Sequence, residues 1–181
     1  YLFSKKKYRI LTTGEPTGGV YGRKIREMLR DDKDTGSNKE KILDLFIKDR
    51  KEHLKNTVLP FLNSPNDGMR IVLCDRYYYS TIAFQHAQGF DIKTLIEKNS
   101  SFRKPDIAFI LDVEPETALK RIDNDGRKLE KFEKLEFMEK VRGNFLGLKD
   151  YLGDNIKIID ADRDIDDVFN ELKKEMAELI S

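Results

Sequence analysis

The chain has 181 residues, 39% of them hydrophobic and 37% charged, which indicates one globular domain over residues 1–181 with a highly charged surface. Its 34 Lys and Arg residues nearly balance its 33 Asp and Glu residues. Dedicated nucleic-acid-binding proteins carry a basic excess, so we expect no nucleic-acid partner. No apolar run approaches the length of a membrane span, and a single cysteine permits no intramolecular disulfide. These features predict a cytoplasmic protein with no membrane partner.

Four short apolar runs alternate with segments of helical periodicity along the chain. The runs are Arg9–Thr13, Arg70–Cys74, Ile107–Leu111 and Ile156–Ile159. Short apolar runs separated by helices are typical of a parallel sheet covered on both faces. The sequence therefore predicts an α/β fold with a doubly wound parallel sheet flanked by helices, and it places Cys74 in the core at the end of a buried strand.

Helical periodicity is clearest at the C-terminus, where apolar residues at spacings of three and four from Ile165 to Leu179 share one face. Asp162 or Asp164 is the expected N-cap of that helix. Further helices are predicted over Thr94–Lys98, Pro115–Ile122 and Glu136–Leu152. The polar stretch Asp31–Lys41 is predicted to be a loop, since it contains Gly36 and Ser37.

Acidic residues follow three of the four predicted strands, at Asp75, Asp112 and Asp160. Doubly wound sheets bind ligands at the carboxyl ends of their strands. In the pair Asp75-Arg76, the arginine is suited to hold a phosphate through two parallel hydrogen bonds, and the aspartate to hold the water shell of Mg²⁺. The alternative is that Asp75 caps the next helix and pairs with Arg76 on the surface.

Phe46 and Arg50 lie four residues apart in a helical segment and therefore share a face. A phenylalanine can stack on a base while an arginine reaches an exocyclic oxygen. The alternative is a core phenylalanine with a solvated arginine. His53 and His86 fit no pattern of metal binding or nucleophilic catalysis.

Two more segments fit a phosphate-binding enzyme. Gly14–Gly19 forms a loop rich in Gly and Pro after the first strand, where glycines permit tight turns and close approach of a ligand. Arg121–Glu133 is dense in charge and lies between two predicted helices. This second segment is either a solvated connection or a lid that closes arginines over a transferring phosphoryl group.

Taken in order, these motifs resemble the thymidylate kinase family, in a form similar to its archaeal members. The motifs that carry the resemblance are Glu15-Pro16, Phe46 to Arg50, Asp75-Arg76-Tyr77 with Ser80, Ala83-Phe84-Gln85, Lys104-Pro105-Asp106, Leu111-Asp112-Val113, Phe132-Glu133 and Ile159-Asp160-Ala161. They run from about Arg9 to the C-terminus.

The resemblance implies a P-loop NTPase-like fold with a lid over about residues 121–135, and a homodimer. It implies transfer of a phosphoryl group from the co-substrate ATP to dTMP, with Mg²⁺ as the cofactor. Phe46 corresponds to the ring that stacks on thymine, and Arg50 to the arginine that reads the base. The remaining residues implied are Glu15, Arg76, Ser80 and Phe84 for the substrate, Arg121, Arg127 and Ala161 for ATP, Asp75, Arg76 and Arg127 for catalysis, and Asp75 for the metal. Lys128 or Lys131 is the alternative to Arg127.

The sequence departs from the family in three respects. Glu130-Lys131 stands where many members have Asp-Arg before the aromatic residue of the lid. Gly14 stands where many bacterial members have an arginine, and no Gly-x-x-x-x-Gly-Lys-Ser/Thr motif occurs in the 181 residues. That motif cradles phosphates in the family, and the strand before it lies mid-sheet, between the strands at 70–74 and 107–111. We therefore expect about 25 further N-terminal residues in the natural chain. The alternatives are an inactive nucleotide-binding or regulatory module, and a kinase for another pyrimidine monophosphate.

Overall fold

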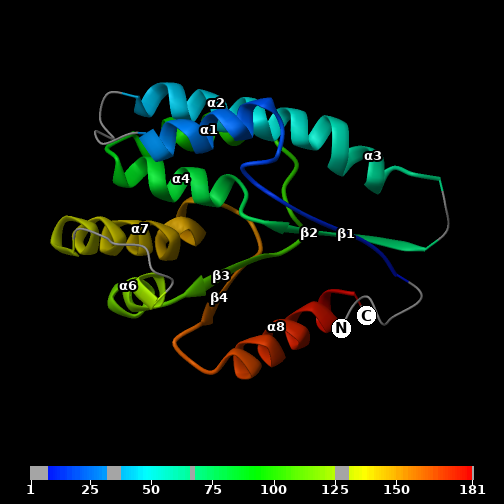
Figure 1. Cartoon of the computed structure of the whole chain (residues 1–181). Helices are drawn as coiled ribbons and strands as arrows, with labels where there is room; N and C mark the ends of the chain where they lie inside the picture. The colour runs from blue at the N-terminus through cyan, green and yellow to red at the C-terminus, as the bar shows by residue number, and fades with distance from the viewer. Residues whose placement is uncertain (1–7, 32–37, 66–67, 125–130, 181) are drawn as a thin grey trace. The chain divides into compact units, whose positions relative to one another are not determined.

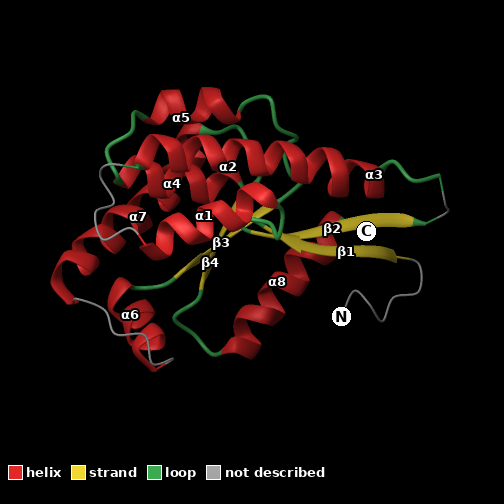
Figure 2. Cartoon of the chain, turned by 45° about the horizontal axis from the view of Figure 1, so that its top comes forward, coloured by secondary structure: helices red, strands yellow, loops and turns green. Residues whose placement is uncertain are grey.

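The computed structural model describes residues 8–31, 38–65, 68–124 and 131–180 (Figure 1). These residues form two compact units that divide between Phe102 and Arg103. Parallel strands and intervening helices make up both units, as the α/β class predicts (Figure 2). The doubly wound arrangement of a single domain stays a prediction.

Two parallel strands organise the first unit. Strand β1 (Tyr8–Gly14) pairs with β2 (Met69–Asp75), so that Tyr8 lies opposite Met69 and Gly14 opposite Asp75. The backbone N–H of Glu15 continues this pairing with a 2.9 Å hydrogen bond to the carbonyl oxygen of Asp75. The register therefore brings the loop after β1 and the Asp75-Arg76 pair to the same edge.

Helices pack against one another in the first unit, and α1, α2 and α4 lie side by side in Figure 1. The helices are α1 (Val20–Asp31), α2 (Lys39–His53), the π-helix η2 (Leu54–Val58), α3 (Leu59–Leu62), α4 (Tyr78–Ala87) and α5 (Ile92–Asn99). Contacts at both ends of α2 show that it runs antiparallel to α4. Lys39 Nζ lies 3.4 Å from the carbonyl oxygen of Gln88, and Arg50 Nη2 lies 2.9 Å from Thr81 Oγ1.

The second unit repeats the pattern with β3 (Ala108–Asp112) and β4 (Ile156–Asp160), which pair in parallel with Asp112 opposite Asp160. Its helices are α6 (Pro115–Asn124), α7 (Lys131–Tyr151) and α8 (Ile165–Leu179). Asp164 is the N-cap of α8, and its carboxylate accepts a 2.9 Å hydrogen bond from the backbone N–H of Asp166. Of the two predicted caps, Asp164 is therefore the one that the structure selects.

Two predictions about local environment were wrong, those for Cys74 and for the loop at residues 31–41. Cys74 is exposed, because β2 pairs only with β1 among the described strands and its last three residues lack cover. Helix α2 already begins at Lys39, inside the predicted loop, and its first residues are good helix formers. The apolar face of α8 is only half covered. Ile165 is 80% exposed, whereas the contact of α8 with β4 includes the ion pair of Glu175 and Lys157 at 2.9 Å, further along the helix.

Candidate active site

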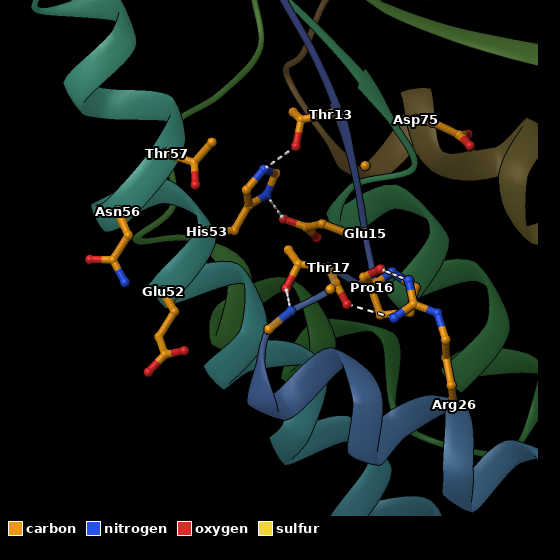
Figure 3. Close-up of a pocket in the computed structure, with 13 residues that line it drawn as sticks. Thr13, Glu15, Pro16, Thr17, Arg26, Glu52, His53, Asn56, Thr57 and Asp75 are labelled. Carbon is orange, nitrogen blue, oxygen red and sulfur yellow. Dashed lines mark hydrogen bonds and ion pairs between the residues drawn. The ribbon is translucent and has the colours of Figure 1, made fainter.

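A cavity of about 650 Å³ opens at the carboxyl ends of β1 and β2 (Figure 3). Its walls come from the loop after β1, from the end of α2 with η2, and from the end of β2. The lining residues are Thr13, Gly14, Glu15, Pro16, Thr17, Gly18, Gly19, Arg26, Glu52, His53, Asn56, Thr57 and Asp75. The cavity is large enough for a small organic ligand.

Glu15 and Arg50 form a buried ion pair beside this cavity. Arg50 is 1% exposed and Glu15 is 6% exposed. The Arg50 Nε donates to Glu15 Oε2 at 2.9 Å, and Nη2 of the same guanidinium lies 2.8 Å from that oxygen. Two buried charges are stable together only when their hydrogen bonds are satisfied, so this pair fixes the position of both side chains.

Side chains from α4 and α5 complete the surroundings of Arg50. Nη2 donates to Thr81 Oγ1 at 2.9 Å, and Nη1 donates to Asn99 Oδ1 at 2.5 Å. The guanidinium carbon also lies 5.2 Å from the ring centre of Tyr77 and 5.5 Å from that of Phe102. Burial of the Tyr77 hydroxyl, together with the negative charge of Glu15, raises the pKa of Tyr77 above its usual range. Tyr77 therefore stays a neutral phenol against the cation.

His53 lies between Thr13 and Glu15, as Figure 3 shows. Its Nδ1 is 3.0 Å from Glu15 Oε1, and its Nε2 is 2.7 Å from Thr13 Oγ1. His53 is 4% exposed. An ionised carboxylate only accepts hydrogen bonds, so Nδ1 donates to Glu15 and a neutral ring accepts at Nε2 from the Thr13 hydroxyl.

The loop of residues 15–19 is held from two helices. On α2, the buried carboxylate of Asp49 accepts from the backbone N–H and the hydroxyl of Thr17. On α1, Arg26 donates to the carbonyl oxygens of Thr17, at 2.6 Å, and of Pro16. Helix α1 approaches the loop so closely that a Cβ at Gly22 would overlap the Thr17 carbonyl oxygen. The loop is therefore positioned before any ligand binds.

Arg76 lies between Asp75, the last residue of β2, and Tyr77, which precedes α4. It is exposed and has a φ of 63°, in the left-handed region that non-glycine residues rarely adopt. Its guanidinium carbon lies 5.7 Å from the ring centre of Phe84, so the structure brings two predicted substrate residues together. Tyr77, the N-cap residue of α4, supplies no side-chain cap. An arginine beside a helix N-terminus is a favourable arrangement for an anion.

Gln85 is a buried polar residue with an unsatisfied atom. It is 3% exposed, and its Oε1 has no hydrogen-bond partner among the described residues. Gln85 lies one helical turn after Thr81 on the same face of α4. Helix α2 runs antiparallel to α4. The step of one turn from Thr81 to Gln85 on α4 therefore runs in the same direction as the step from Arg50 to Phe46 on α2. A buried amide oxygen without a partner among the described residues points to a ligand that donates a hydrogen bond to it.

In the second unit, two predicted ATP residues contact each other, since Arg121 Nη2 donates to the carbonyl oxygen of Ala161 at 3.1 Å. At the end of β3, Arg142 of α7 donates to both carboxylate oxygens of Asp112, at 2.7 and 3.0 Å, and also bonds to Glu114. This pairing lowers the pKa of Asp112 below its usual range, with the Arg142 hydrogen bonds as the largest cause. Arg127 and Lys128 lie outside the described residues.

The structure therefore brings Glu15 next to Arg50, Arg76 next to Phe84, and Arg121 next to Ala161. Phe46 and Ser80 are half-buried. Phe46 lies one turn before Arg50 on α2, and Ser80 directly precedes Thr81 on α4. Sequence reasoning missed Asp49, His53 and Gln85. One signal was available for His53, because residues 46, 50 and 53 recur on one face of a helix.

The Asp75 carboxylate is exposed and makes no hydrogen bond or ion pair with the described residues. No three His, Cys, Asp or Glu side chains of the described ranges gather closely enough to hold a metal ion by themselves. Mg²⁺ is commonly held by one carboxylate together with waters and phosphates, so a lone exposed aspartate fits that cation. Among the described helices, none has the length and apolar character needed to cross a membrane.

Comparisons with a family model and with individual proteins point to the same family. The family model for thymidylate kinase matches residues 2–172. A thymidylate kinase of Desulfotalea psychrophila is 36% identical over 181 residues, covering 99% of this chain and 85% of the relative. A probable thymidylate kinase of Archaeoglobus fulgidus is 37% identical over 174 residues, covering 96% and 82%. A probable thymidylate kinase of Pyrococcus horikoshii is 36% identical over 174 residues, covering 94% and 82%.

Proposed function

Because the chain belongs to the thymidylate kinase family, we propose that it transfers the γ-phosphoryl group of ATP to dTMP, giving ADP and dTDP. An oxygen of the dTMP phosphate forms the new bond to the γ-phosphorus, and the bond from that phosphorus to the β-phosphate oxygen breaks. Phosphoryl transfer needs positioning and charge compensation more than covalent chemistry from the protein. The residues at the site are suited to both tasks.

The observation that carries the proposal is the position of Arg76. Its exposed guanidinium stands at the N-terminus of α4, where the backbone N–H groups and the helix dipole favour negative charge. We assign the dTMP phosphate to this place. A strained backbone at a non-glycine residue persists where the surrounding structure requires it, and this is common at functional sites.

We assign the thymine base to the space between α2 and α4. Phe46 supplies a half-buried ring for stacking, and Ser80 and Phe84 line the sugar and the base. The buried Gln85 amide complements the edge of thymine, which presents one N–H donor between two carbonyl acceptors. Arg50 and Glu15 form the wall behind the base, with Arg50 directed by its contacts to Glu15, Thr81 and Asn99.

We assign ATP to the Arg121–Ala161 contact, where a backbone carbonyl and a guanidinium adjoin the carboxyl end of β4. Arg127 is proposed as the lid arginine that neutralises charge during transfer. Asp75 is the residue that would hold Mg²⁺ through its water shell, and that ion would supply charge neutralisation for the phosphates. We also propose that the protein is a homodimer located in the cytoplasm.

The test is a coupled assay of ADP release by the full-length protein with dTMP, dUMP and dCMP as acceptors. We expect turnover with dTMP to exceed turnover with dUMP by about 10- to 200-fold in kcat/KM, the range set by one methyl group in an apolar pocket. Arg76→Lys should lower kcat/KM for dTMP at least about 10-fold, since lysine cannot make two parallel hydrogen bonds to a phosphate.

Arg163→Lys is the matched control, because Arg163 pairs with Glu171 on the exposed surface of α8. Tight dTMP binding by the wild-type protein without turnover would contradict the kinase and support a regulatory module. Equal losses in the Arg76 and Arg163 variants would contradict the phosphate assignment.

A further inference from the structure

We infer that His53 is a positioning residue for base recognition, which sets the orientation of Arg50 through the carboxylate of Glu15. The inference rests on the proposed function, because it requires that Arg50 face the base of the acceptor nucleotide. Sequence analysis gave His53 no role. The structure places it in a continuous series of hydrogen bonds that runs from β1 to α5, part-buried at Thr13 and buried from His53 to Asn99.

This series of hydrogen bonds begins at Thr13 and ends at Asn99. The Thr13 hydroxyl contacts His53 Nε2 at 2.7 Å, and His53 Nδ1 contacts Glu15 Oε1 at 3.0 Å. The other oxygen of Glu15 accepts from Arg50 Nε at 2.9 Å. The two oxygens of one carboxylate therefore serve two different α2 residues, and a change at one oxygen alters the position of the other.

Three members of this series of hydrogen bonds are buried. His53, Glu15 and Arg50 are 4%, 6% and 1% exposed, so water cannot replace a lost hydrogen bond at low cost. A carboxylate held by Arg50 alone retains rotation about its own bond axis. The donation from His53 Nδ1 removes that freedom and leaves one orientation for the carboxylate and for the guanidinium that it holds.

The backbone after His53 supports a specialised position. His53 is the N-cap residue of η2, a π-helix over Leu54–Val58 that interrupts the helical path from α2 to α3. π-helical turns inside α-helices occur frequently at functional sites. This turn also brings Asn56 and Thr57 to the wall of the cavity that His53 lines.

The alternative is that His53 only fills space between α2 and β1. Two near-isosteric substitutions separate the two roles. The amide nitrogen of asparagine takes the place of Nδ1 as a donor, and the amide oxygen of glutamine takes the place of Nε2 as an acceptor. His53→Asn keeps the donor to Glu15 and loses the Thr13 contact, whereas His53→Gln does the reverse. If His53 only fills space, the two variants should have the same effect.

The experiment is steady-state kinetics of the full-length protein with dTMP and ATP varied in turn. We expect His53→Ala and His53→Gln each to raise KM for dTMP about 10-fold, with kcat changed less than about threefold and KM for ATP unchanged. His53→Asn should stay within about threefold of wild type. His86→Asn is the control, since His86 Nδ1 lies 2.8 Å from the Phe90 carbonyl oxygen, at the end of α4 away from Arg76.

A loss shared equally by the asparagine and glutamine variants, or a fall in kcat with KM unchanged, would overturn the inference. If the alanine variant fails to fold, Thr13→Val tests the inference instead. Valine keeps the shape of the threonine side chain and replaces the hydroxyl by a methyl group. We expect it to raise KM for dTMP about threefold. An unchanged KM for dTMP in Thr13→Val would contradict the role of these hydrogen bonds.

Two further measurements keep the inference apart from the proposed function. Nitrogen-15 NMR of the His53 ring should show the tautomer protonated at Nδ1, and the opposite tautomer would overturn the inference whatever the enzyme does. Absence of dTMP turnover in the wild-type protein would instead refute the proposed function. Turnover in the wild type with an unaltered KM in His53→Ala would refute the role of His53 alone.

Discussion

Asp49 on α2 and Thr17 in the loop after β1 are joined by two hydrogen bonds, from the Thr17 backbone N–H to Oδ2 at 2.7 Å and from its hydroxyl to Oδ1 at 2.6 Å. Asp49 is 2% exposed, so its charge is stabilised within the protein rather than by water. Together with Arg50 and His53 it makes one end of α2 a support for the loop, which Arg26 of α1 also holds. The loop in turn carries Glu15.

The first prediction concerns this support. Asp49→Asn replaces one acceptor oxygen by an amide N–H₂ that faces the donors of Thr17, so we expect the free energy of unfolding to fall by about 2 kcal/mol. Urea denaturation measures the change. Asp44→Asn on the same helix is the control, because Asp44 pairs with Lys48 on the exposed surface and contributes only about 0.5 kcal/mol or less. Equal losses in the two variants would contradict the argument.

The second prediction concerns the buried ion pair. Arg50→Met leaves the Glu15 carboxylate buried without its cation, and we expect a loss of about 3–5 kcal/mol in the free energy of unfolding. The double variant Glu15→Gln with Arg50→Met removes the uncompensated charge and should recover part of that loss. Chemical denaturation of both variants tests the pair. A double variant no more stable than the single one would show that charge burial is not the cause.

The third prediction concerns pH. Arg142 lowers the pKa of Asp112 in the folded protein relative to about 3.9 in the unfolded chain. A lowered folded pKa contributes stability that is fully present above the unfolded pKa and is lost as the pH falls through the folded pKa. We therefore expect the Tm difference between wild type and Arg142→Met to be constant above about pH 5 and to shrink below about pH 4.

Thermal unfolding between pH 2.5 and 7 measures that difference, and Arg163→Met is the control for loss of an exposed arginine. A difference that grows toward low pH would contradict the pairing of Asp112 with Arg142. Asp112 is partly exposed, so the size of the effect is reduced by solvent screening, and the direction is the decisive observation.

The fourth prediction separates stability from binding at Gln85. Gln85→Leu removes a buried amide whose oxygen has no partner among the described residues. We expect the unliganded protein to be as stable as wild type, or more stable, because an unsatisfied polar group disappears. KM for dTMP should nevertheless rise about 10-fold or more, since the base loses its amide contact. Parallel loss of stability and affinity would indicate a structural role for Gln85.

The sequence alone determined much of the local structure. The apolar runs predicted all four described strands to within two residues at each end, because each run must bury its side chains between helices. The start of the apolar periodicity at Ile165 limited the N-cap of α8 to Asp162 or Asp164, and the structure selects Asp164. The ordered motifs, from Glu15-Pro16 to Ile159-Asp160-Ala161, determined the family, and the comparisons confirmed it.

Only the tertiary structure decided which side chains meet. His53 and Glu15 are 38 residues apart, and Arg50 and Asn99 are 49 apart, so no local spacing predicts their contacts. Burial of Cys74 was predicted from the apolar run that contains it, yet cover depends on neighbouring elements rather than on the run. Long-range hydrogen bonds form because buried charges require partners, and the fold determines which partners lie within reach.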